Sequence, residues 1–135
     1  MKKKYWLGLS SMLLLAACGN GAGETAGSEG TTGGDGSGVV IGGNFELSGG
    51  ASAYGTPMSN AVELAVELKN KDGGISDEDV TYKVYDNTSV AQEAASVATR
   101  LATEDKVTAI IGPATTGDAV AQTPVLDRAG VPAVL

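Results

Sequence analysis

From residue 38 onward, short apolar runs alternate with stretches in which apolar residues recur at helical spacing. The runs are rich in β-branched residues and predict buried strands, whereas the spaced stretches predict helices. The strands are expected at residues 38–45, 80–86, 106–112 and 131–135. The helices are expected at residues 57–71, 89–105 and 117–129. This alternation predicts an α/β fold with a doubly wound parallel sheet, right-handed crossovers and helices on both faces.

The expected helices show their apolar stripes and their ends in the sequence. In the first helix, Thr56–Pro57 is typical of an N-cap followed by proline at the first helical position. Gly73 or Gly74 is expected to end this helix in a left-handed conformation. The stripe of the first helix comprises Met58, Ala61, Leu64, Ala65 and Leu68. The stripe of the second comprises Val90, Ala94, Val97, Ala98 and Leu101.

In open parallel sheets, ligands bind outside the carboxyl ends of the strands. Two segments are expected at that edge: residues 46–55, "ELSGGASAYG", and residues 112–118, "GPATTGD". The second segment leads into a helix, whose N-terminus offers unpaired N–H groups and a partial positive charge. Thr115 and Thr116 add hydroxyl donors, and Gly117 permits close approach, so this segment is suited to a carboxylate. The alternative is that Thr116 only N-caps the third helix.

The composition excludes several classes of chemistry. The 135 residues carry a formal net charge of −7, include no histidine and have Cys18 as the only cysteine. Zinc binding, disulfide bonds and most nucleophilic catalysis therefore lack their residues, and neither a metal nor a cofactor is expected. The acidic surface makes nucleic acid an unfavourable partner. No phosphate-loop motif occurs, which argues against a nucleotide-binding enzyme on this type of sheet.

The amino-terminal region predicts export and anchoring. Residues 1–18 combine a basic start, a short apolar stretch and small residues before Cys18, the layout of a secretory signal. Their last four residues, "LAAC", resemble the lipobox of bacterial lipoproteins, which implies that Cys18 becomes lipidated. An ordinary signal peptide with a chance cysteine is the alternative. Residues 19–37 include eight glycines and no large apolar side chain, so a flexible tether is expected.

Four segments of the sequence, taken in order, resemble the amino-terminal lobe of ABC-transporter substrate-binding proteins of the branched-chain amino acid (Leu/Ile/Val) type. They are "GNFELSGGASAYG", "AVELAVELKNKDGGI", "VYDNTSVAQEAASVATRL" and "VTAIIGPATTGDAVAQTPVLDRAGVPAVL". The resemblance implies a periplasmic-binding-protein fold of type I, in which two lobes close on a small ligand. Residues 38–135 would then form most of the first lobe. Because the sequence stops at Leu135 inside an apolar strand, we expect a longer gene product.

The resemblance also implies partners, location and roles. The ligand would be a branched-chain or other small amino acid, or a related amide, delivered to ABC permease subunits. The protein would be extracytoplasmic, lipid-anchored to the outer face of the bacterial cell membrane. A ligand-sensing domain of the same fold in a receptor is the alternative function. In either case it would be no enzyme.

Five residues are expected at the ligand, four of them by this resemblance and Thr115 as a hydroxyl donor at the helix start. Thr116 lies where the family places a hydroxyl on the ligand carboxylate, beside Thr115, and Ala114 where a main-chain carbonyl meets the α-ammonium group. Tyr54 matches an aromatic residue beside the ligand, although it could instead cover a helix start. Ser48 lies in the same loop, where serine is also common as turn chemistry. Asp86 and residues 70–74 are assigned structural roles, as a strand end and a helix stop.

Overall fold

The computed structural model describes residues 38–135, and the signal peptide and tether expected at residues 1–37 lie outside the described residues. Strands and helices alternate as the sequence predicts. The elements are β1 (Val40–Phe45), α1 (Ser52–Lys71), β2 (Thr81–Asp86), α2 (Ala91–Thr103), β3 (Ala109–Ile111), α3 (Thr116–Ala129) and β4 (Ala133–Val134). Apart from the start of α1, the predicted element ends agree with the structure to within three residues.

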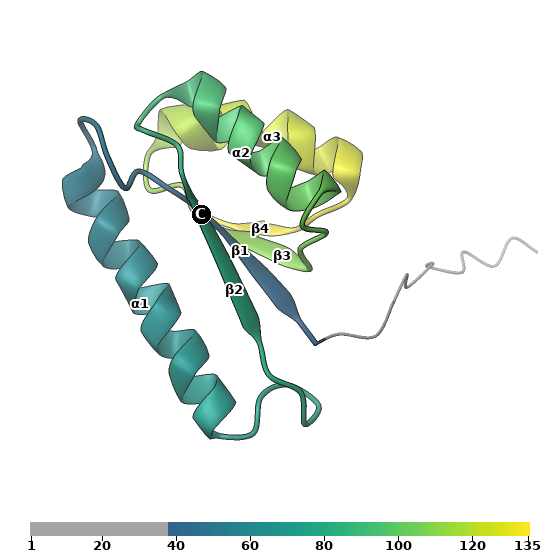
Figure 1. Cartoon of the computed structure of the whole chain (residues 1–135). Helices are drawn as coiled ribbons and strands as arrows, with labels where there is room; N and C mark the ends of the chain where they lie inside the picture. Colours follow the sequence, from purple (N-terminus) through teal and green to yellow (C-terminus); the bar gives the residue numbers. More distant parts are fainter. Residues whose placement is uncertain (1–37) are drawn as a thin grey trace, which may run out of the picture. The chain divides into compact units, whose positions relative to one another are not determined.

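The four strands form one parallel sheet in the order β2-β1-β3-β4. The chain first moves from β1 through α1 to β2 at one edge, and α2 then carries it back past β1 to β3. Because crossovers are right-handed, this reversal places α1 on one face and α2 and α3 on the other, as Figure 1 shows. The fold is therefore the predicted doubly wound α/β arrangement, and the order reverses between β1 and β3.

The hydrophobic core lies between the sheet and the α2–α3 face. Val97, Ala98 and Leu101 of α2 pack there with Ile110 of β3 and Leu126 of α3, and all five are buried. The predicted stripe of α2 is therefore confirmed. Its first member, Val90, is the exception: it is the N-cap residue and is exposed.

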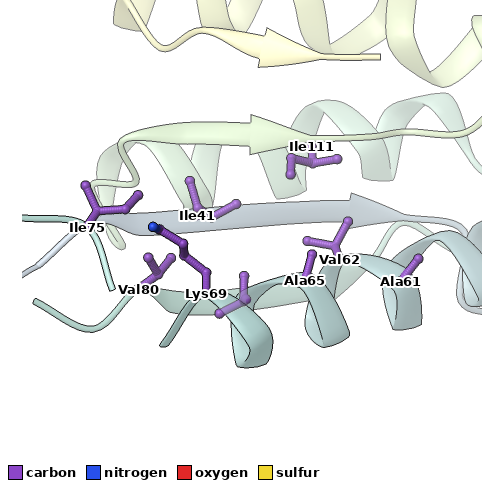
Figure 2. A pocket seen from close by; sticks show the side chains of 9 residues that line it. Ile41, Ala61, Val62, Ala65, Lys69, Ile75, Val80 and Ile111 are labelled. Carbon is purple, nitrogen blue, oxygen red and sulfur yellow. The ribbon is translucent and has the colours of Figure 1, made fainter. Parts of the chain in front are cut away.

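The opposite face of the sheet is covered more loosely by α1. Val62 of this helix faces Ile41 of β1 and Ile111 of β3 across an apolar groove of about 370 Å³, seen from close by in Figure 2. Leu64 and Leu68, from the stripe noted in the sequence, are instead exposed to solvent. Two apolar stripes lie on this helix at helical spacing, so periodicity alone does not tell which one faces the sheet.

The sequence places the start of the first helix at Thr56–Pro57, and this prediction is wrong. The helix begins at Ser52 and Pro57 lies inside it. An additional turn forms because the N–H of Gly55 donates to the carbonyl of Ala51 at 3.2 Å. Gly55 also packs directly on the backbone of Glu46, where a side chain would collide. This tertiary contact, which is absent from the local sequence pattern, stabilises the extra turn.

The other end of α1 confirms the prediction. After the C-cap residue Asp72, Gly73 and Gly74 have φ angles of 94° and 71°, in the left-handed region that glycine adopts at low cost. The N–H of Gly74 donates to the carbonyl of Lys69 at 2.9 Å, which satisfies one of the last carbonyl groups of the helix.

Candidate ligand site

The candidate site is formed where two loops meet at the carboxyl edge of the sheet. β1 and β3 are parallel neighbours, with Ile41 opposite Ala109 and Gly43 opposite Ile111. The loops that follow them, residues 46–51 and 112–115, therefore emerge at the same edge. The strand order reverses between these two strands, so the loops flank a topological switch point. Crevices at such points are the usual ligand sites of open α/β sheets.

A side chain that the sequence reasoning did not single out connects the two loops. Glu46, the first residue after β1, is fully buried. One of its carboxylate oxygens accepts the N–H of Ala114 at 3.0 Å, and the other accepts the N–H of Thr115 at 3.1 Å. The signal that could have found it is a lone acidic residue directly after a buried strand, at the edge where ligands bind.

A second buried carboxyl group, Asp118, lies in the first turn of α3. Burial raises the pKa of Asp118, and the neighbouring Glu46 carboxylate raises this pKa further, against the Thr115 hydroxyl. Burial by itself would also raise the pKa of Glu46, but hydrogen bonds, including those from the Ala114 N–H and from Asp118, lower it below its ordinary value. The two neighbouring carboxyl groups thus have pKa values shifted in opposite directions, upward for Asp118 and downward for Glu46.

Thr115 and Thr116 have different positions. Thr115 is the N-cap residue of α3, with φ −110° and ψ 144°, and Thr116 is the first helical residue, so the alternative that Thr116 is the cap is wrong. The Thr115 hydroxyl donates to the Asp118 carboxylate at 2.9 Å. In a capping box the third helical residue would accept the N–H of the N-cap residue, but here Glu46 accepts it.

The backbone N–H donors that remain for a ligand at the start of α3 belong to residues 116–118. We expected N–H groups from Thr115 to Asp118 to be available, but the Thr115 N–H is taken by Glu46. Within residues 38–135, the N–H groups of Thr116, Gly117 and Asp118 have no protein acceptor. The side chain of Thr116 is exposed. Three N–H donors and one hydroxyl are thus presented at the N-terminus of α3, an arrangement suited to a carboxylate.

The loop after β1 is held from the other side by Asp86, at the end of β2. Its carboxylate accepts the Ser48 hydroxyl at 2.6 Å and the N–H groups of Leu47, Ser48 and Thr88 at 3.0, 3.1 and 2.7 Å. Burial opposes ionisation of this carboxyl group, but the four donors outweigh it and lower the pKa of Asp86. The structural role assigned to Asp86 is confirmed. The Ser48 hydroxyl proton is used inside the protein, so this group offers a ligand an acceptor more readily than a donor.

The remaining predicted residues lie at the same edge. Tyr54 is on the first turn of α1 and is 68% exposed, so it does not cover the helix start as a buried aromatic residue would. Ala114 is half-buried and directs its N–H at Glu46. The structure thus places Ser48, Tyr54 and residues 114–116 on the two loops and the helix starts around the switch point.

Buried amide side chains fix the framework behind the loops. Asn44 of β1 donates to the Ala94 carbonyl of α2 at 2.9 Å and to the side-chain oxygen of Gln122 at 2.8 Å. Gln122 of α3 in turn donates to the Gly112 carbonyl at 2.7 Å, at the start of the second loop. Fully satisfied buried networks rigidify their surroundings, so the loop after β3 is attached to both β1 and α3.

The part of the chain that the structure describes contains no group of three or more His, Cys, Asp or Glu side chains that could hold a metal ion. Over the same residues, no helix is both long enough and apolar enough to cross a membrane.

The comparison with protein families decides the classification. The family described as periplasmic binding protein matches residues 38–135, all of the described part. The chain belongs to the periplasmic binding protein family. This chain is 34% identical over 93 residues to one relative, Leu/Ile/Val-binding protein homolog 3 of Brucella melitensis biotype 1. It is 32% identical over 93 residues to Leu/Ile/Val-binding protein BraC3 of Rhizobium johnstonii. Each match covers 69% of this chain and 25% of the relative.

Solved structures agree with this classification. The binding protein is similar to the branched-chain amino acid transporter substrate-binding protein LivJ of Streptococcus pneumoniae, solved in complex with isoleucine, with 44% identity and a TM-score of 0.70. The match covers 71% of this chain and 28% of LivJ. The leucine-binding protein LivK of Thermotoga maritima matches with 28% identity and a TM-score of 0.64, over 70% and 26% of the two chains. The chain thus spans about a quarter of the length of these relatives.

Proposed function

We propose that this binding protein is the extracytoplasmic solute-binding component of an ABC importer, and that its ligand is a branched-chain or other small amino acid. In this proposal the loops after β1 and β3 form one wall of a cleft, and a second lobe of the longer protein forms the other. The protein acts by binding and release rather than by catalysis. Its relatives carry names of binding proteins, which supports this assignment.

The observation that carries the proposal is the N-terminus of α3. An α-carboxylate that leaves water must be paired with donors, because burying an unpaired charge is costly. The N–H groups of Thr116, Gly117 and Asp118 and the Thr116 hydroxyl supply such donors without a fixed cation. Neutral donors bind an anion reversibly, which suits a protein that must release its ligand to a permease.

Calorimetric titration of the gene's full-length product with L-isoleucine, L-leucine and L-valine tests the ligand class. L-isoleucinol, which keeps the side chain and the ammonium group but lacks the carboxylate, is the matched control ligand. We expect at least one of the three amino acids to bind and isoleucinol to bind at least about a hundredfold more weakly, since two or more hydrogen bonds to a charged group are lost. Equal binding of isoleucine and isoleucinol would contradict a carboxylate site at α3.

Uptake of radiolabelled isoleucine tests the transport role. Cells that lack the gene should import isoleucine more slowly than the parent strain, and the full-length gene should restore the rate. A normal uptake rate, together with tight binding by the purified protein, would favour a ligand-sensing receptor of the same fold.

We also propose that the protein is held at the outer face of the cell membrane by lipid on Cys18. This residue lies outside the described residues, and the proposal rests on the lipobox resemblance of residues 15–18. Two acyl chains on one residue would be sufficient for stable anchoring.

A further inference from the structure

We propose that Glu46 is the positioning residue of the ligand site, because its buried carboxylate fixes the loop after β3 and leaves Thr116–Asp118 as the donors for the ligand. This inference rests on the function proposed above. Glu46 does not touch the ligand in this account. It acts through the backbone of Ala114 and Thr115.

Glu46 contacts the loop after β3 through both of its carboxylate oxygens. The two oxygens of Glu46 accept one N–H each, from Ala114 at 3.0 Å and from Thr115 at 3.1 Å. Two hydrogen bonds to one planar group constrain its orientation as well as its distance. Glu46 is itself fully buried, so solvent does not compete for these donors. The contact joins residues 46 and 114, which are 68 positions apart in the chain.

The contacts of Glu46 limit where the ligand carboxylate can bind. An anion at a helix N-terminus takes the unpaired N–H groups that point at it. Glu46 already occupies the N–H of Thr115, the N-cap residue, and that of Ala114 before it. The next donors in the chain belong to Thr116, Gly117 and Asp118, the first turn of α3. Glu46 thereby determines which donors are available to the ligand.

The two contacts with the loop after β3 require a glutamate at position 46. A glutamine amide has one acceptor oxygen, and its NH₂ group would face an N–H donor of the loop. An aspartate keeps both oxygens but is one methylene shorter, so it cannot reach both N–H groups without movement of the backbone. Asp86 of β2 contacts the loop after β1 one residue beyond Glu46, at Leu47.

Hydrogen exchange and isoleucine titration of the full-length gene product test the proposal together. Glu46→Gln should speed exchange of the peptide covering residues 112–117 relative to the rest of the protein, and it should weaken isoleucine binding roughly tenfold or more. Glu63→Gln, an exposed site on α1, is the matched control and should change neither.

Each outcome decides the inference. Unchanged exchange at residues 112–117, or unchanged affinity for isoleucine, in Glu46→Gln overturns it. If Glu46→Gln does not fold, as judged by loss of a cooperative melt, Glu46→Asp replaces it, and wild-type exchange and affinity in that variant overturn the inference. If the wild-type protein binds no isoleucine, the proposed ligand is wrong, and the exchange experiment alone decides whether Glu46 holds the loop.

Discussion

Glu46 and Asp118 are two buried carboxyl groups that interact across the gap between the end of β1 and the first turn of α3. Two neighbouring carboxylates repel each other when both are ionised, so ionisation of one disfavours ionisation of the other. The pKa of Asp118 is raised, by burial first and by Glu46 next, and the pKa of Glu46 is lowered by hydrogen bonds that outweigh its burial. Ionisation is therefore favoured on Glu46, the residue that holds the ligand loop, and disfavoured on Asp118.

The pair predicts a dependence of stability on pH. The stabilisation from Asp118 is complete below its ordinary pKa of 3.8 and is lost as pH rises through its raised folded-state pKa. The stabilisation from Glu46 is present above its ordinary pKa of 4.5 and is lost as pH falls through its lowered folded-state pKa. Asp118→Asn removes the loss of stability that ionisation of Asp118 causes as the pH rises.

Denaturant unfolding of the full-length product at a series of pH values measures this difference. Asp86 also has a lowered pKa and contributes to the acid limb, but it does so equally in wild type and Asp118→Asn. The free energies of unfolding of the two proteins should diverge as the pH rises above 3.8. Curves that stay parallel over the whole range would show that the pKa of Asp118 is not raised in the folded protein.

Replacement of Thr116 by valine is expected to affect binding more than folding. Valine keeps the shape and the methyl group but removes the hydroxyl, and Thr116 is exposed and makes no cap hydrogen bond. A ligand carboxylate deprived of one donor should lose about 1–3 kcal/mol of binding free energy. Calorimetric titration with isoleucine and a denaturant melt on the same variant separate the two effects.

The matched control for that variant is Thr115→Val. The Thr115 hydroxyl donates to Asp118 inside the protein, so its loss should lower the free energy of unfolding by about 1 kcal/mol. A larger loss of affinity in Thr115→Val than in Thr116→Val would mean that the assignment of these two threonines is reversed.

Asp86→Ala is expected to loosen the loop after β1. The substitution removes the acceptor of the Leu47, Ser48 and Thr88 N–H groups and of the Ser48 hydroxyl. Because these groups are only partly buried, water replaces some of the lost bonds, and the free energy of unfolding should fall by about 1–3 kcal/mol. Asp127→Ala on the exposed side of α3 is the control and should change stability by less than about 0.5 kcal/mol.

Two leucine substitutions test which face of the sheet holds the core. Leu101→Ala removes a fully buried side chain between α2 and the sheet and should cost about 2–5 kcal/mol. Leu64→Ala removes a side chain of α1 that is 55% exposed, and it should cost less than about 1 kcal/mol. Thermal unfolding of the full-length variants gives the comparison. Similar losses for the two would mean that Leu64 is buried in the folded protein.

Labelling of cells with a radioactive fatty acid tests the lipid anchor. The wild-type protein should take up label and sediment with membranes, and Cys18→Ala should do neither. A wild-type protein that carries no label would leave the amino-terminal segment as an ordinary signal peptide.

The order of elements was predictable because hydrophobic periodicity is a local property. Runs of β-branched residues specify strands wherever both faces of a sheet are covered, and the stripe at Ala94, Val97, Ala98 and Leu101 has a single apolar face. The edge of the sheet that carries the candidate site was also predictable, since the carboxyl ends of parallel strands share one edge. From this, residues 114–116, Ser48 and Tyr54 could be placed at one edge.

What the tertiary structure decided involves contacts between distant residues. The helix α1 begins at Ser52 and not at the predicted Thr56–Pro57. Its extra turn is stabilised because Gly55 packs on the backbone of Glu46, nine positions away in sequence but in direct contact in space. Which stripe of α1 faces the sheet depended on the partners offered by β1 and β3. The role of Glu46 depended on donors 68 and 69 positions further along the chain, and so did the use of the Thr115 N–H. Local patterns record which residues can form an element, but only the packed chain determines which donors remain for a ligand.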